Sequence, residues 1–456
     1  MHMRKIAILA AVSLGSAACV NFTGEKLDSS PNSPTTATID QSFVAVQGIG
    51  FSTLTSDLAM FSNLVVQQLS GNGRQWVAYD QYNQPEDFFS IQPFYTTGGL
   101  LDIRKAQAGA KARGDRLYTG ILQVWEVLLM GVAADVYGDI GYSEALTGVP
   151  AKLDPQEQVY ARLQLVLDTA ITNIAAGGQG PRGTDLAYGG SATKWGKLAH
   201  TLKARLYMHT GEKASAAYPL ALAQAKLGIS SAADDFVSYQ SSTVGEQNRW
   251  YEFKQGRSDD VAAGRILVEL MRTRGDPRLA QWIDVNGAGQ IRGQFPYNLP
   301  RLGEEADPSW LTDLIAGQDS PMPIATWAET KLIEAEAAYR GGDATGALAA
   351  LNAVRTTVPL PALAGLTGTA LFTAIMEEKY VDTFRSLESW NDYKRTCYPN
   401  ITPTAGKTNV IGRLPYGSQE RSANPNVPAL GAQPAKNWND PITATSTDGS
   451  ACRGQR

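Results

Sequence analysis

The chain has 456 residues, of which 43% are hydrophobic and 18% are charged, and these proportions are typical of a folded soluble protein. Its 40 Lys and Arg nearly balance its 44 Asp and Glu, so no basic excess is available to bind a phosphate backbone, and we exclude nucleic acid as a partner. The 44 Gly and 23 Pro indicate long, structured loops between the regular elements.

The first eighteen residues form a predicted export signal. Arg4 and Lys5 precede an apolar run from Ile6 to Leu14, and residues 15–18 are all small. This run is too short to cross a bilayer as a helix, which is typical of a secretory signal rather than an anchor. We expect no later stretch to reach membrane-spanning length.

Cys19 follows the small residues directly, and this arrangement resembles a bacterial lipoprotein signal. The usual pattern has Leu three positions before the cysteine, where this chain has Ser16. The resemblance implies that Cys19 is the first mature residue and carries the lipid anchor, with residues 19–36 as a Ser/Thr/Pro/Asn-rich tether. An ordinary signal peptide with an incidental cysteine is the alternative. Residues 37–456 are then expected to form a single domain.

Two further cysteines remain after lipidation of Cys19. Export places Cys397 and Cys452 in an oxidising compartment, and their even number predicts a disulfide between them. The alternative is two separate free thiols, since sequence alone does not give their geometry.

Apolar residues recur at three- and four-residue spacing beyond the tether, and this periodicity is typical of amphipathic helices. We expect one or two helices in residues 42–69 and single helices in residues 101–113, 116–136, 154–175, 194–209 and 214–227. A further pair is expected at residues 323–339 and 344–356, with glycines ending the first helix and Asp343 capping the second. Both this pair and the pair at 194–227 resemble tetratricopeptide-type hairpins, so the predicted fold is all-α.

Four stretches between the helices lack periodicity. These are residues 70–99, 232–260, 285–318 and everything from 398 onward. Loops of this length are usually functional or disordered, and their aromatic content argues against disorder.

An ordered set of short blocks resembles the SusD/RagB family of outer-membrane nutrient-binding lipoproteins. The most specific block, residues 134–146 (ADVYGDIGYSEAL), is similar to the family's DxYGDIPYSEAL-like string, although Gly141 stands where the family often has Pro. The others, in the family's order, are residues 194–206, 275–279, 328–337, 377–384 with 390–395, and 413–416 with Glu420 and 424–426.

The resemblance implies a helical repeat scaffold with a large irregular face built from loops. It also implies a lipid-anchored protein at the cell surface that captures oligosaccharides or peptides and passes them to a SusC-like TonB-dependent outer-membrane transporter, without a cofactor and without catalysis. Two other classes stay open: an envelope glycoside hydrolase or peptidase, and a repeat scaffold that binds only protein partners.

Sugar recognition needs flat aromatic rings and a few fixed polar groups. Loop position and side-chain type therefore select the candidate substrate-binding residues, which are Asn72, Arg74, Trp76, Tyr79, Tyr82, Phe88 and Phe89 in the first loop and Trp250 and Tyr251 in the second. The alternative for each ring is a place in the core beneath the loops.

No catalytic residue and no metal site is predicted. Asp135 and Asp139 are interpreted as capping groups at a helix end and turn rather than as an acid and base pair. The two histidines of the mature chain lie in one predicted helix but lack the i, i+4 spacing of helical zinc ligands. Glu334 and Glu336, in an Ala-rich helix, are expected to be a solvated or hairpin-bridging pair.

Overall fold

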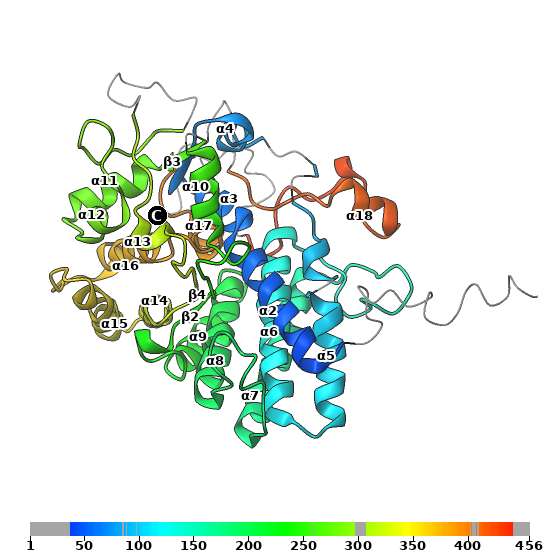
Figure 1. Cartoon of the computed structure of the whole chain (residues 1–456). Helices are drawn as coiled ribbons and strands as arrows, with labels where there is room; N and C mark the ends of the chain where they lie inside the picture. Colours follow the sequence, from blue (N-terminus) through cyan, green and yellow to red (C-terminus); the bar gives the residue numbers. More distant parts are fainter. Residues whose placement is uncertain are drawn as a thin grey trace, which may run out of the picture.

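The computed structural model describes residues 37–440, except 84–85, 88, 97, 259, 297–306, 402, 404–406 and 408–409. The predicted signal and tether, together with Cys19, Phe88 and Cys452, lie outside the described residues. The part of the chain that is described is mostly helical, with four short strands (Figure 1), which confirms the all-α prediction.

The first predicted helical region is two helices, α2 (Ile39–Thr55) and α3 (Asp57–Val65), which meet at Ser56. Helix α2 begins at a capping box, in which Thr38 and Gln41 each satisfy a backbone N–H of the other. Helix α2 packs onto α5 (Leu100–Ala112) and α6 (Arg116–Tyr137), and α3 packs onto α17 (Glu388–Thr396).

Helix α6 forms the centre of the molecule. It is the one helix in the described chain that is long and apolar enough to cross a membrane, with a mean hydropathy of 1.5, and this window is 100% buried. The expectation that no later stretch reaches membrane-spanning length was therefore wrong on length. Because α5, α7 (Gln156–Ala176) and α8 (Ala192–Thr210) cover it, α6 is a core helix.

Helical hairpins continue from α6 across the lower half of Figure 1. Helices α8 and α9 (Ala217–Ala225) form one hairpin, α14 (Trp327–Arg340) and α15 (Ala344–Thr357) form another, and α16 (Gly368–Asp382) packs against the second. Alanines at the α9–α14 contact let the backbones approach closely. In the predicted turn Gly342 adopts a φ of 83°, and Asp343 accepts the Gly346 N–H at 2.8 Å, so this turn is confirmed.

Two small antiparallel sheets fasten the irregular face to this scaffold. Strand β1 (Leu69–Gly71) pairs with β3 (Val261–Ala263), and β2 (Phe236–Val237) pairs with β4 (Pro323–Ala325). The face also carries short helices that the sequence did not predict: α4 (Arg74–Asp80), α10 (Arg249–Arg257), α11 (Arg265–Thr273), α12 (Arg278–Trp282), α13 (Asp313–Ala316) and α18 (Ser418–Ala423). Single 3₁₀ turns, η1 (Gln92–Phe94), η2 (Ala232–Asp234) and η4 (Leu430–Ala432), complete it.

Candidate functional site

Four of the candidate ligand-contacting rings lie in the core. Trp76, Tyr79, Tyr82 and Trp250 are between 0% and 6% exposed. The Trp250 indole N–H donates to the Thr55 carbonyl at 2.9 Å, which anchors α10 to the scaffold. Side chains buried to this degree pack the face from beneath, so for these four residues the structure matches the alternative that places them in the core of the loops.

The two predicted loops nevertheless come together. The Asn72 N–H donates to the Asp260 carbonyl at 2.7 Å, and the Arg74 guanidinium lies 3.0 Å from the Asp260 carboxylate. The Asn72 side chain is partly exposed and that of Arg74 is 60% exposed. Tyr251, one residue after the buried Trp250, is half-buried on α10. The pairing of β1 with β3 accounts for this approach, because it places the two loops at one end of the same short sheet.

A row of aromatic rings connects these loops below the surface. Phe89 contacts Phe61, Phe61 contacts Tyr79, Tyr79 contacts Trp76, and Trp76 contacts Phe253, with ring centroids 5.2–6.0 Å apart and edge-to-face geometry. This geometry suits the quadrupoles of the rings. The middle of the row is buried, whereas Phe89 at one end is half-buried. Phe89 is therefore the predicted ring that remains accessible on this row.

Phe89 lines an open pocket of about 270 Å³ between α2, α3 and the end of α6. Its apolar wall also includes Leu58 and Phe94, and its polar groups come mainly from the junction of α2 and α3. The full lining is Ile49, Ser52, Thr53, Ser56, Asp57, Leu58, Phe89, Ser90, Pro93, Phe94 and Tyr137. One accessible ring, several hydroxyls and one carboxylate are the groups that a small polar ligand with an apolar face requires.

A hydrogen bond between two lining residues, Tyr137 and Phe89, stabilises the wall of this pocket. The Tyr137 hydroxyl donates to the Phe89 carbonyl at 3.2 Å, which fixes the loop to the end of α6. Burial raises the pKa of Tyr137 well above its usual range, and the charge of Glu420 raises it further while Arg413 opposes it. Tyr137 therefore stays a neutral hydrogen-bond donor at physiological pH, and the Phe89 backbone keeps its position.

The sequence did not point to the polar side of the pocket. The polar lining residues lie at the ends of two helices, whereas the predicted ligand contacts all lie in the long loops; these lining residues are Ser52, Thr53, Ser56 and Asp57. The available signal was the cluster of hydroxyl and carboxylate side chains at residues 52–57, within a region otherwise predicted to be helical and apolar.

A group of carboxylates lies in the core, where the block around Asp135 meets α8 and α17. Arg205 binds both oxygens of Glu329 at 2.7 Å and lies 3.5 Å from Glu388. His209 lies between Asp135 (2.9 Å) and Glu388 (2.8 Å). Asp135 is therefore an ion-pair partner inside α6, and its interpretation as a cap was wrong.

The other half of that interpretation was correct, because Asp139 caps the next helix. Its carboxylate accepts the N–H of Gln156, the first residue of α7, at 2.8 Å.

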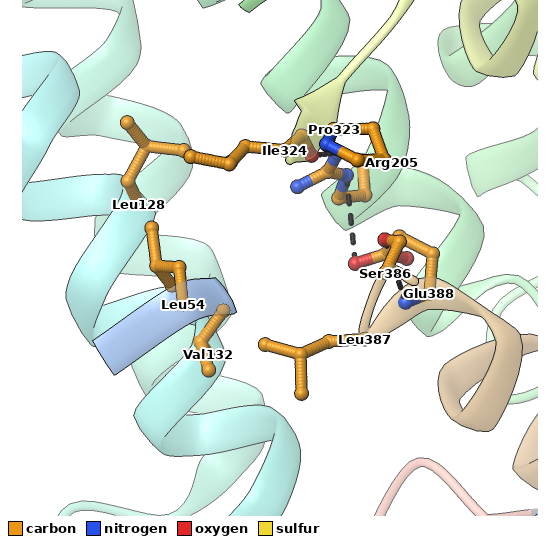
Figure 2. Close-up of a pocket in the computed structure, with 9 residues that line it drawn as sticks. All are labelled: Leu54, Leu128, Val132, Arg205, Pro323, Ile324, Ser386, Leu387 and Glu388. Carbon is orange, nitrogen blue, oxygen red and sulfur yellow. Dashed lines mark hydrogen bonds and ion pairs between the residues drawn. The ribbon is translucent and has the colours of Figure 1, made fainter. Parts of the chain in front are cut away.

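Figure 2 shows the cavity beside this cluster, with Arg205 and Glu388 on one side and Leu54, Leu128 and Val132 opposite. Its volume is about 10 Å³, which is room for one water molecule. A glycan or peptide does not fit there, so these paired carboxylates have no access to a substrate.

Asp135, His209 and Glu388 also have the spacing of a metal-ligand group. Burial lowers the pKa of His209, but the two carboxylates outweigh it and raise that pKa to about 9. The imidazole is therefore protonated at neutral pH and bridges the two carboxylates as a cation. The geometry is that of a buried ion triad.

A second buried cluster corrects the expectation for Glu336, which is 0% exposed. Its carboxylate binds Arg395 at 2.5 and 2.7 Å and Lys379 at 2.9 Å, and Asp392 closes the cluster. Glu334 pairs instead with Lys331 near the surface. Glu336 is therefore not solvated, and it joins α14 to α16 and α17.

A third cluster surrounds Glu378, which is 0% exposed and is approached by three arginines. Arg278 lies 2.6 Å away and also binds Asp276, while Arg355 lies 3.3 Å away. The three clusters include side chains from five of the blocks that resemble one family, namely residues 134–146, 194–206, 275–279, 328–337, and 377–384 with 390–395. Several of those blocks are therefore motifs of the scaffold and not of the ligand site.

Asp382 is a half-buried carboxylate at the end of α16. It lines a cavity of about 10 Å³ with Thr326, Thr383 and Ser386. Burial raises its pKa from 3.8 to about 7, against the opposing charge of Arg278. The carboxylates of Glu378, Glu329 and Asp235 raise it further.

We expect D382N to become more stable relative to the parent protein as the pH rises from about 4 to 7. In that pH range Asp382 keeps its proton in the folded protein but has lost it in the unfolded protein. The free energy of unfolding of the parent protein therefore falls as the pH rises. The variant does not show this fall, because an Asn side chain does not titrate. Urea unfolding at several pH values measures the difference. A difference that does not change with pH would contradict the assignment.

Cys397 is buried and disulfide-bonded at the end of α17. Cys19 and Cys452 lie outside the described residues, so the predicted pairing with Cys452 stays a prediction.

Comparison with known proteins gives a consistent result. Residues 31–417 match a family described as starch-binding and associating with the outer membrane. A chitin-binding SusD homolog from Flavobacterium johnsoniae has a similar structure, with 19% identity and a TM-score of 0.76 over 90% of this chain and 99% of that one. A SusD/RagB family protein from Bacteroides thetaiotaomicron has 18% identity and a TM-score of 0.69 over 89% and 99%. No curated protein sequence matches the chain.

Proposed function

The chain belongs to the SusD/RagB family of outer-membrane-associated glycan-binding proteins, and from this premise we propose that it captures an oligosaccharide in the pocket beside Phe89. The observation that carries the proposal is the pocket itself, which combines an accessible aromatic ring with hydroxyl and carboxylate groups in about 270 Å³. A pocket of this size holds a sugar unit or two, and the rest of a longer chain extends over the irregular face.

Binding at this site follows from the chemistry of its lining. The Phe89 ring presents an apolar face to the C–H groups of a sugar ring, while Ser52 and Thr53 on α2 and Ser90 beside Phe89 offer hydroxyls for hydrogen bonds. Because Phe89 is fixed by Phe61 and Tyr137, little side-chain entropy is lost when the ligand binds. No covalent step is required, so the proposed activity is capture and not catalysis.

The proposed cellular role extends this capture to uptake. A lipid on Cys19 and the tether of residues 19–36 would hold the domain at the outer membrane, facing the cell exterior, and a SusC-like TonB-dependent transporter would receive the bound glycan. Family membership supports this role. A peptide ligand, a hydrolase and a purely protein-binding scaffold are the competing functions.

Replacement of Phe89 by Ala is expected to weaken oligosaccharide binding about threefold to tenfold, because the variant loses the stacking surface. Phe89→Tyr keeps the ring and should retain most of the affinity. The matched control is Tyr239→Ala, which removes a ring that is 44% exposed and does not line the pocket. Isothermal titration calorimetry measures all three, and equal affinity in F89A and the parent protein would remove Phe89 from the site.

A further inference from the structure

The proposed ligand pocket contains one charged side chain, Asp57, and its charge is not neutralised. Asp57 is exposed at the first position of α3, and in the described part of the molecule its carboxylate forms no ion pair and accepts no hydrogen bond. The positive end of the α3 dipole, worth about half a charge, offsets only part of it. The pocket therefore presents a net negative charge to its ligand.

The pKa values of two nearby tyrosines, Tyr79 and Tyr137, are raised by burial and by negative charge, and the second effect agrees with the negative charge of the pocket. Burial raises the pKa of Tyr79 to about 12, and the charge of Asp57 contributes to that shift. Tyr137 lines the pocket, and the charge of Glu420, which lies outside the lining, also raises the pKa of Tyr137. The opposing cation there, Arg413, is already engaged, since it donates to the Tyr137 carbonyl at 2.8 Å and lies over the Tyr416 ring. Among the residues that line the pocket, Asp57 is thus the carboxylate that a bound cation would meet.

We propose that Asp57 is a specificity-determining residue that selects oligosaccharides carrying a protonated amino group, such as oligomers of glucosamine, over neutral sugars. This inference rests on the proposed capture of a glycan in the same pocket. The ammonium group pairs with the Asp57 carboxylate while the sugar ring lies against Phe89, so one ligand uses both the charged and the apolar side of the pocket.

The surroundings favour an amino sugar over a peptide amine. The α2 backbone at this wall is hydrogen-bonded within the helix, so it offers no strand edge to which a peptide could add. The polar groups that face the ligand are side-chain hydroxyls, and Ser90 Oγ, which accepts the Gln92 N–H at 3.1 Å, keeps its own hydrogen to donate. Hydroxyl groups of a sugar complement these donors and acceptors directly.

The test compares three oligosaccharides of equal length: one of glucosamine, its fully N-acetylated form and one of glucose. Calorimetry is done with the whole mature chain at low ionic strength and at a pH where the amine is protonated. An ion pair at an exposed site changes affinity by roughly twofold to fivefold, so the parent protein should prefer the glucosamine oligomer by about that factor. Added salt should reduce the preference.

Asp57→Asn should abolish the preference, and Asp57→Glu should restore part of it. Asp313→Asn is the control, because it removes a carboxylate that is 79% exposed and outside the pocket, and it should leave the preference intact. Equal affinity of the parent protein for all three ligands, or an unchanged preference in D57N, would overturn the role of Asp57 and leave glycan capture standing. Binding of amine-bearing peptides in place of glucosamine oligomers would also overturn it. Absence of binding to every glycan would remove both proposals.

Discussion

Replacement of Glu336 by Gln is expected to lower the free energy of unfolding by about 3–5 kcal/mol, because it leaves two buried cations without their shared counter-ion. Arg395 and Lys379 both bind the Glu336 carboxylate in a region with almost no solvent exposure. Burial alone would raise the pKa of Glu336, but these cations hold it far below its usual range, which shows how strongly they stabilise the charged form. Asp392 remains a partner of both cations and Glu212 lies 3.9 Å from Arg395, but neither replaces the direct contacts of Glu336 with the two cations.

The matched control for this prediction lies in the same helix. Lys331→Ala breaks the pair with Glu334, whose side chains are 31% and 17% exposed, and should cost less than about 1 kcal/mol. Urea denaturation of both variants measures the two free energies. Equal and small losses would show that the cluster does not tie α14 to α16 and α17.

Replacement of Gly71 by Ala is expected to destabilise the protein by about 1–3 kcal/mol, because a Cβ atom there would lie 2.0 Å from the carbonyl oxygen of Trp76. That oxygen belongs to the backbone, so β1 and α4 would have to move apart. The movement would also shift Trp76 in the aromatic row that ends at Phe89. We therefore expect G71A to lose glycan affinity in addition to stability.

Gly256→Ala provides the opposite control on the same face. Gly256 lies inside α10, and a Cβ atom there would have no neighbour within 4 Å. Alanine has a higher helix propensity than glycine, so the free energy of unfolding of this variant should increase by roughly 0.5–1 kcal/mol. Thermal unfolding of both variants checks the contrast, and a stable G71A with normal binding would show that the contact between β1 and α4 can relax without cost.

The scaffold was predictable from sequence because it depends on periodicity. The apolar spacing of residues 116–136 predicted α6 within a residue of its bounds, and the turn before Asp343 predicted the start of α15. The helix before that turn begins at Trp327 rather than at Pro323, because residues 323–325 form β4. Short helices such as α4 and α10 were missed, since a run of seven to nine polar and aromatic residues has too few turns to show a helical period.

The ligand site was predictable only in part. Loop position selected both Trp76 and Phe89, but whether a ring faces solvent depends on partners distant in sequence, such as Phe253 beneath Trp76. The burial of Glu336 was not predictable either, because its partners Lys379 and Arg395 are 43 and 59 residues away in the sequence. From sequence alone, charged residues in an Ala-rich helix are predicted to be exposed to solvent. The tertiary structure shows that Glu336 is buried beside residues of opposite charge.

The most direct test of the central claim is calorimetric titration of the mature chain with a panel of oligosaccharides and peptides, with each mixture examined afterwards by mass spectrometry. Glycan capture at the Phe89 pocket predicts saturable binding of at least one oligosaccharide, weakened in F89A, with the ligand recovered intact. Recovery of a cleaved ligand, or binding of peptides and no oligosaccharide, would contradict it.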